Sequence, residues 1–255
     1  MEIALTQFVV FLLVFVRVTS LIITAPLIGH VSVPLQVKAG LSVFCAYVLF
    51  PIIAKQTSTI HTNLGWIGFA ALKECAVGLL VGFSLGLLFA GLRYAGELMS
   101  FSMGLSVTNV FDPESGQNTP VVGEFMYLST VLLFLVLNGH HFVFESLAAT
   151  FKTIPLGGAE MNESLFRIVM NCSGMMFVVA VKVAAPVTVA VFLANVAMSI
   201  LARVMPQANI FMLGFPITIG VGFIVLISAS PFLVLVFKKL LAEFEVNIVD
   251  LVKAL

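Results

Sequence analysis

Long runs of apolar residues fill almost the whole chain and are separated by short polar segments. A helix needs about 20 mostly apolar residues to cross a membrane. The pattern therefore predicts spanning helices near residues 4–29, 36–54, 64–92, 125–151, 165–202 and 210–237. The fifth run is long enough for two helices bent at Pro186 or for one tilted helix. A further helix is predicted at 95–111, where it leads into a polar loop.

The composition agrees with an all-α, multi-helix protein of the integral membrane type. Hydrophobic residues make up 61% of the 255 residues and charged residues only 9%, whereas soluble domains carry about 25% charged residues. Twelve basic residues balance twelve acidic ones, which argues against nucleic-acid binding, because that needs a basic face. We see no linker and expect one domain over 1–255. The N-terminus lacks a basic region and a cleavage motif, so we expect a mature helix there rather than a signal peptide.

Charged residues interrupt several of the apolar runs. Arg17 lies in the first run, Lys73 and Glu74 lie side by side in the third, and Lys182 lies in the fifth. A charge at the centre of a bilayer costs about 2.5–3.5 kcal/mol on insertion scales. We therefore expect these four side chains to be paired or hydrated inside an assembly rather than to face lipid.

The longest uncharged run, Val204–Phe237, contains three prolines, Pro206, Pro216 and Pro231. Proline cannot donate a backbone hydrogen bond, so helices kink or break at it. Broken helices are tolerated at membrane depth only where protein or a cavity satisfies the freed backbone groups. The run therefore predicts kinked helices packed on other protein.

Small residues recur every fourth position in the third run, at Gly78, Gly82, Gly86 and Ala90. A ladder of this kind lets a second helix approach closely. It indicates helix packing and says nothing about chemistry.

The C-terminal segment 240–255 is predicted to be an amphipathic tail helix. Leu241, Phe244, Ile248 and Leu251 recur at helical spacing. Such a stripe either lies on the membrane surface or docks on a partner, and we expect a partner. Lys238 and Lys239 precede it directly. The positive-inside rule then predicts that the C-terminus lies in the cytoplasm.

Motifs of catalysis are missing from the sequence. It contains no H-E-x-x-H, G-x-S-x-G or G-x-x-x-x-G-K-[ST] pattern. His140 and His141 are adjacent, so they cannot share one helix face, and Glu145 is the only acid one turn away. We therefore expect no enzyme, no cofactor and no metal site.

Two polar features invite a functional interpretation. Arg93 and Glu97 are spaced as an i,i+4 pair. It is either a modest surface ion pair or, as we expect beside so much apolar sequence, a buried pair that fixes helix register. The segment Phe111–Phe125 carries three acids and no base, together with turn-forming Asp-Pro, Gly and Thr-Pro. It is either an ordinary extramembrane loop or a mobile segment at the mouth of a channel.

A set of motifs along nearly the whole chain resembles the FliR family of flagellar biosynthesis proteins of the type III export apparatus. The motifs are RVTSLIITAP (17–26), VPLQVKAGL (33–41), RYAGE (93–97), MGLS (103–106), FDPESGQNTPVV (111–122), FLVLNGHH (134–141), IPLGG (154–158) and RVMPQANIFMLGFPITI (203–219). The last block is the most specific. A homologous export protein of virulence secretion systems has a similar pattern, and the TP and GFP motifs favour the flagellar one.

The resemblance implies a function in protein export. FliR proteins join FliP and FliQ in the core of the export gate of the inner membrane, in the flagellar basal body, and FlhB docks against this core. Helical hairpins and kinked helices pack in this hetero-oligomer, lifted largely out of the bilayer plane, and unfolded flagellar subunits pass through its centre. The family's plug corresponds to about Gly104–Val121 here.

Two groups of site residues follow. The expected plug or gate comprises Phe111, Asp112, Pro113, Glu114, Gly116, Thr119, Pro120 and Val121. The expected assembly residues are Arg93, Glu97, Pro206, Gln207, Asn209, Gly214 and Pro216, of which the last five would shape a helix break. From the residues alone, a secondary transporter for a small solute and a scaffold without pore contact remain alternatives, although we find no internal repeat that a transporter would show.

Overall fold

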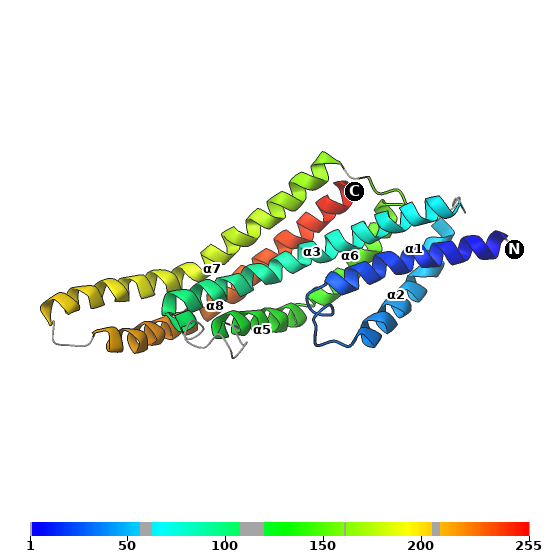
Figure 1. The fold of residues 1–255 in the computed structure, drawn as a ribbon. Helices are drawn as coiled ribbons and strands as arrows, with labels where there is room; N and C mark the ends of the chain where they lie inside the picture. Colours follow the sequence, from blue (N-terminus) through cyan, green and yellow to red (C-terminus); the bar gives the residue numbers. More distant parts are fainter. Residues whose placement is uncertain (1, 57–62, 108–119, 161, 206–209, 255) are drawn as a thin grey trace. The chain divides into compact units, whose positions relative to one another are not determined.

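The computed structural model describes residues 2–56, 63–107, 120–160, 162–205 and 210–254. Within these ranges the regular elements are all helical, which confirms the all-α class. They are α1 (Glu2–Thr24), α2 (Leu35–Gln56), α3 (Leu64–Met103), the 3-10 helix η1 (Leu105–Val107), α5 (Val121–Val136), α6 (Gly139–Thr153), α7 (Glu163–Val204) and α8 (Ile210–Ala254) (Figure 1).

Several predicted boundaries are wrong, and each has a local cause. The helix predicted at 64–92 continues without a break into the one predicted from residue 95, and the two form α3 as far as Met103, because Arg93 and Glu97 lie side by side on its surface and do not interrupt it. The single helix predicted at 125–151 is divided into α5 and α6, which meet at 71°. Asn138 occupies the break with a φ of 57°, a left-handed conformation that asparagine tolerates better than most residues.

Within the described residues, five helices are long and apolar enough to cross a membrane, or six if the bent α5–α6 pair forms one span. Helix α3 has 40 residues, α7 has 42 and α8 has 45. At 1.5 Å per residue these helices are about 60 Å long or more, which is roughly twice the thickness of the hydrocarbon core. Each of these helices is therefore longer than a single perpendicular crossing of the membrane requires.

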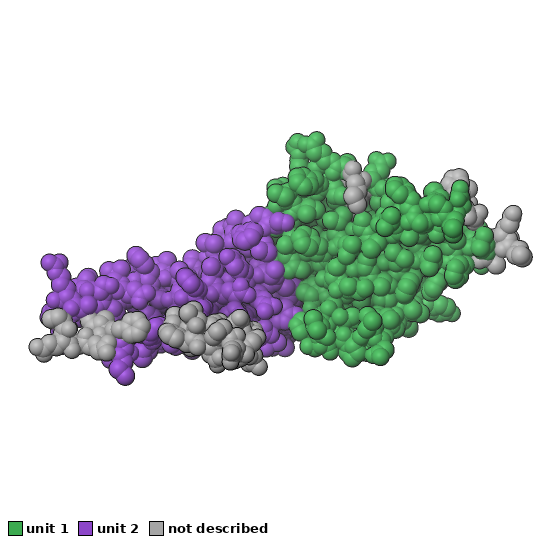
Figure 2. All heavy atoms as spheres, viewed as in Figure 1, with its two compact units in different colours: residues 1–87, 138–172, 242–255 green, residues 88–137, 173–241 purple. Residues whose placement is uncertain are grey.

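The chain divides into two compact units (Figure 2). Unit 1 contains residues 1–87, 138–172 and 242–255, and unit 2 contains residues 88–137 and 173–241. Helices α3, α7 and α8 each contribute residues to both units. A single domain over 1–255 stays a prediction.

In unit 1, α1 packs against α3 through the first half of the glycine ladder. A Cβ on Gly78 would overlap the Ser20 side chain and the Arg17 carbonyl oxygen, and a Cβ on Gly82 would lie 2.8 Å from the Cβ of Thr24. The predicted close approach of a second helix is confirmed at these two positions. Gly86 has open space beside it, so the ladder serves packing within the chain only over its first two steps.

In unit 2, the end of α3 packs with α5, α7 and α8 around a core of small and medium-sized apolar side chains. Gly96 of α3 allows the start of α5 to approach, since a Cβ there would lie 2.6 Å from the carbonyl oxygen of Val122. The buried members of this core are Ala95, Met99, Met103, Val122, Met126, Ala180, Val183, Ala184, Val187, Val191 and Leu226.

The tail predicted at 240–255 is the end of α8 rather than a separate helix, because the chain stays helical through Lys238 and Lys239. Its apolar stripe is buried inside the chain, with Phe244 6% and Leu251 0% exposed. Phe244 packs edge-on against Phe142 of α6, with ring centroids 6.1 Å apart. The prediction that this stripe contacts a partner is therefore wrong, because the chain's own helices cover it.

Candidate functional site

A buried polar cluster in unit 1 is built around an ion pair between Arg17 of α1 and Glu74 of α3. The Nε of Arg17 donates to Oε2 of Glu74, and both side chains are fully buried. Glu74 also accepts a 2.8 Å hydrogen bond from the backbone N–H of Gly157. A buried charge is tolerated when it is both paired and hydrogen-bonded in this way.

The guanidinium of Arg17 uses its remaining donors on α6 and the segment that follows it. It donates to Oγ1 of Thr150 at 3.3 Å and to the carbonyl oxygen of Ile154 at 3.4 Å. Its carbon lies 4.3 Å from the centroid of the Phe151 ring. Three segments far apart in the sequence are thus joined by one pair of charges.

The 154–158 segment is fitted to this cluster by its glycine. Gly157 has a φ of +74°, and a Cβ there would lie 3.1 Å from Cζ2 of Trp66 and 3.2 Å from Cβ of Ala70. Lys73 donates to the carbonyl oxygen of Gly157 at 3.2 Å, and its Nζ lies 5.1 Å from the centre of the Phe69 ring. Three of the four predicted embedded charges therefore have partners inside the chain.

The fourth, Lys182 of α7, differs from the others. It is exposed in this chain, and it forms no hydrogen bond or ion pair with a described residue. Its pairing within an assembly stays a prediction.

Arg93 and Glu97 form the predicted i,i+4 interaction, with Nε and Oε1 3.6 Å apart. The side chains are 45% and 37% exposed, so the expected burial is wrong for the single chain. Tyr127 of α5 approaches Arg93, whose guanidinium carbon lies 5.9 Å from the ring centroid. A role of the pair in assembly stays a prediction.

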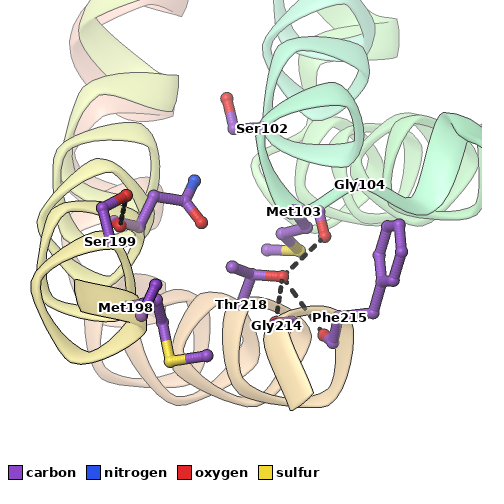
Figure 3. A pocket seen from close by; sticks show the side chains of 10 residues that line it. Ser102, Met103, Gly104, Met198, Ser199, Gly214, Phe215 and Thr218 are labelled. Atoms are coloured by element: carbon purple, nitrogen blue, oxygen red, sulfur yellow. Dashed lines mark hydrogen bonds between the residues drawn. The ribbon is translucent and has the colours of Figure 1, made fainter. Parts of the chain in front are cut away.

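A pocket of about 520 Å³ lies in unit 2 where α3 ends and α8 begins (Figure 3). Its described walls combine hydroxyl and amide groups with two methionines and one aromatic ring, and none of the described lining side chains is charged. The lining residues are Ser102, Met103, Gly104, Asn195, Met198, Ser199, Ala202, Gly214, Phe215 and Thr218.

Thr218 holds the two helices together at this pocket. Its hydroxyl lies 3.1 Å from the carbonyl oxygen of Met103 and 3.1 Å from the carbonyl oxygens of Gly214 and Phe215 in its own helix (Figure 3). The last carbonyls of a helix have no donor within the helix, so the hydroxyl supplies one to the end of α3.

Two glycines allow this contact. Gly104 ends α3 with a φ of +83° beside the Phe215 ring, a conformation that glycine adopts without steric cost. Gly222 admits the Met103 side chain, because a Cβ there would lie 2.6 Å from Cγ of Met103.

Most predicted plug and assembly residues cannot be compared with this geometry. Pro120 and Val121 are described and start α5, with Val121 70% exposed. Gly214 lines the pocket, and Pro216 lies inside α8, which is not broken there. The residues outside the described ranges are Phe111, Asp112, Pro113, Glu114, Gly116, Thr119, Pro206, Gln207 and Asn209.

Sequence reasoning missed the pocket and the partner of Met103. Thr218 was visible only as part of the block 203–219, where a threonine four residues after Gly214 gives no sign of a partner in another helix. Asn195 and Ser199 share one face of α7 and could have been noticed as a polar pair within an apolar run.

The adjacent histidines do not form a metal site with other described residues. The rings of His140 and His141 lie 4.4 Å apart at their centroids. Among the residues that the structure describes, no group of three or more His, Cys, Asp or Glu side chains could hold a metal ion.

Comparisons with known proteins agree with the motifs. The family described as "Bacterial export proteins, family 1" matches residues 8–244. The flagellar biosynthetic protein FliR of Bacillus subtilis is 34% identical, over 91% of this chain and 90% of its own length. The FliR protein of Escherichia coli is 31% identical over 94% and 91%, and that of Pectobacterium carotovorum is 34% identical over 83% and 80%.

Proposed function

The chain belongs to the FliR family of flagellar export proteins, and we propose that it forms, with FliP and FliQ, the channel through which unfolded flagellar proteins cross the inner membrane. Membership of this family makes it an inner-membrane component of the flagellar export apparatus. The named partners, including FlhB, and the unfolded substrates belong to the proposal.

One observation carries the proposal beyond family membership. Helices α7 and α8 expose large apolar side chains along lengths that exceed a single bilayer crossing. Lipid can cover only about 30 Å of such a helix. The rest of the apolar surface needs protein neighbours, as a subunit of a hetero-oligomeric gate would have.

The segment Phe111–Val121 is proposed as the plug of the closed channel. Phe111 and Val121 would supply an apolar seal, and constrictions of this kind gate by excluding water. Asp112 and Glu114 would lie where water or backbone can solvate them, since burying an unpaired carboxylate is costly. The family's plug corresponds to about Gly104–Val121, and the fact that Gly104 lines the pocket supports the proposal.

Residues of the 203–219 block are proposed to seat the chain on neighbouring subunits. Gln207 and Asn209 would satisfy backbone groups freed between α7 and α8, where an unpaired polar group would cost about 1–3 kcal/mol. Replacing both by leucine should abolish recovery of the complex. Normal recovery with intact motility would contradict this role.

Co-purification tests the proposed function. Tagged chain expressed with FliP and FliQ should be isolated from membranes as one complex that contains both partners and restores motility to a strain lacking its own FliR protein. Isolation as a monomer or dimer that binds a small solute would favour a secondary transporter. Restoration of a virulence secretion system instead of motility would favour the homologous export protein.

The orientation of the C-terminus is tested separately. We propose that it lies in the cytoplasm, because Lys238 and Lys239 form a basic cluster in α8. Val246 is 60% exposed, so Val246→Cys in a chain without its native cysteines should react with a thiol reagent from the cytoplasmic side alone. Labelling from the periplasm would contradict the orientation.

A further inference from the structure

Helix α7 has two apolar faces, and unit 2 covers only one of them. Ala180, Val183, Ala184, Val187 and Val191 are buried in the core of unit 2. Residues on another stripe of the helix are three, four or, once Lys182 is included, seven positions apart, and the apolar ones are between 38% and 61% exposed. Its apolar members are Met175, Val178, Val189, Leu193, Val196 and Ile200. This second face, the α7 stripe, has the spacing of a helix that packs against another helix.

Lys182 lies within the α7 stripe. It is four residues from Val178 and seven from Val189, so all three share one face of the helix. Between Arg167 and Arg203 it is the one charged residue of α7. Either end of the helix is about 30 Å away along its axis, which is too far for a lysine side chain to reach.

Contact with lipid alone does not fit a stripe that carries this charge. A lysine at mid-bilayer on a lipid-facing surface costs about 2.5–3.5 kcal/mol. No residue that the structure describes forms an ion pair with Lys182. Two acids of α3 are already paired within this chain, because Glu74 is buried with Arg17 and Glu97 interacts with Arg93.

We propose that the α7 stripe docks an apolar helix of a different subunit, and that this helix presents an Asp or Glu carboxylate to Lys182. This inference rests on one part of the proposed function, namely that the chain is a subunit of a membrane complex. The apolar residues on both sides of Lys182 exclude water from the pair, and the charges fix the register of the two helices. A docked helix of this kind accounts both for the exposed apolar residues of the α7 stripe and for the lysine among them.

Crosslinking in the intact membrane complex tests which surface covers the stripe. Cysteines replace Val189 and Leu193 on the stripe, and Val181, which is 59% exposed but lies off the stripe, provides the control. The native cysteines Cys45, Cys75 and Cys172 are first replaced by alanine. We expect V189C and L193C, and not V181C, to crosslink to one helix of another subunit. Crosslinking between two copies of this chain, or labelling of the stripe by a lipid-phase probe, would overturn the inference.

Charge exchange tests the carboxylate. Lys182→Leu should lower recovery of the complex about 100-fold, because it leaves a buried carboxylate unpaired, whereas Lys182→Arg should retain recovery. Lys182→Glu should be rescued by changing the acid of the crosslinked helix to lysine. Unchanged recovery and motility with Lys182→Leu would overturn the inference.

The two proposals can fail separately. If FliP and FliQ co-purify but the stripe reacts with the lipid probe, the docking inference fails and the proposed function stands. If the stripe crosslinks to an acidic helix of an unrelated membrane protein, the docking inference stands and the proposed function fails.

Discussion

Arg17 and Glu74 lie 57 positions apart in the sequence and form an ion pair with no exposed surface on either side chain. The pair joins α1 to α3 and, through Gly157 and Ile154, to the segment that follows α6. Arg17 of the first apolar run and Glu74 of the third therefore neutralise each other, so neither of these side chains meets lipid.

Removing one member of this pair should cost more than replacing both. Arg17→Leu or Glu74→Leu leaves a buried charge unpaired and should lower the free energy of unfolding of unit 1 by about 3–5 kcal/mol. The double replacement with leucine should be markedly less harmful than either single one. Chemical unfolding of the purified chain in detergent gives the comparison.

The control for this prediction is Arg167→Ala. Arg167 pairs with Glu163 at 2.7 Å, but these side chains are 74% and 79% exposed, and exposed helical pairs contribute about 0.3–0.5 kcal/mol. Equal losses for Arg17→Leu and Arg167→Ala would show that burial of the first pair is not what matters.

Replacing glycines of the α3 ladder by alanine should change the stability of the chain differently at different positions of the same helix. Gly78→Ala and Gly82→Ala should each destabilise the chain by about 1–3 kcal/mol, because the added Cβ meets α1. Gly86→Ala meets open space and should leave the isolated chain equally stable or stabilise it by up to about 1 kcal/mol. Thermal unfolding of the three variants measures this. A loss at Gly86 as large as that at Gly78 would contradict the packing described.

The end of α3 should loosen when Thr218 loses its hydroxyl. Thr218→Val keeps the shape of the side chain but removes the donor to the carbonyl oxygen of Met103, at a cost of about 1 kcal/mol. We expect faster hydrogen exchange at the end of α3 and the start of α8. Thr188→Val is the matched control, since the Thr188 hydroxyl bonds to Ala184 of its own helix. Equal exchange in both variants would count against a link between the helices.

Patterns local in the sequence predicted much of the fold. The apolar runs gave the helical class, and the spacing of Gly78 and Gly82 gave the close approach of α1. The division between α5 and α6 was missed because Asn138 and Gly139 lie inside a run of strong apolar character. The tail stripe was assigned to a partner because its spacing identifies an apolar face and not the surface that covers it.

The candidate site depended on contacts that the sequence does not encode locally. Arg17, Lys73 and Glu74 were recognisable as charges in apolar runs, but nothing in their positions pairs Arg17 with Glu74 rather than with another subunit. The α7 stripe was hidden for a related reason: both faces of that helix are apolar, so its hydrophobic pattern does not distinguish the buried face from the exposed one.

The conductance of membranes that hold a complex with a shortened plug tests the central claim most directly. In a complex with FliP and FliQ, deletion of Ser115–Thr119 should leave assembly largely intact and make the inner membrane leaky to ions, seen as increased conductance and as growth inhibition at high salt. The unaltered complex should stay closed under the same conditions. A fully assembled mutant complex in a membrane that remains tight would contradict the plug, and with it the proposal that this segment closes an export channel.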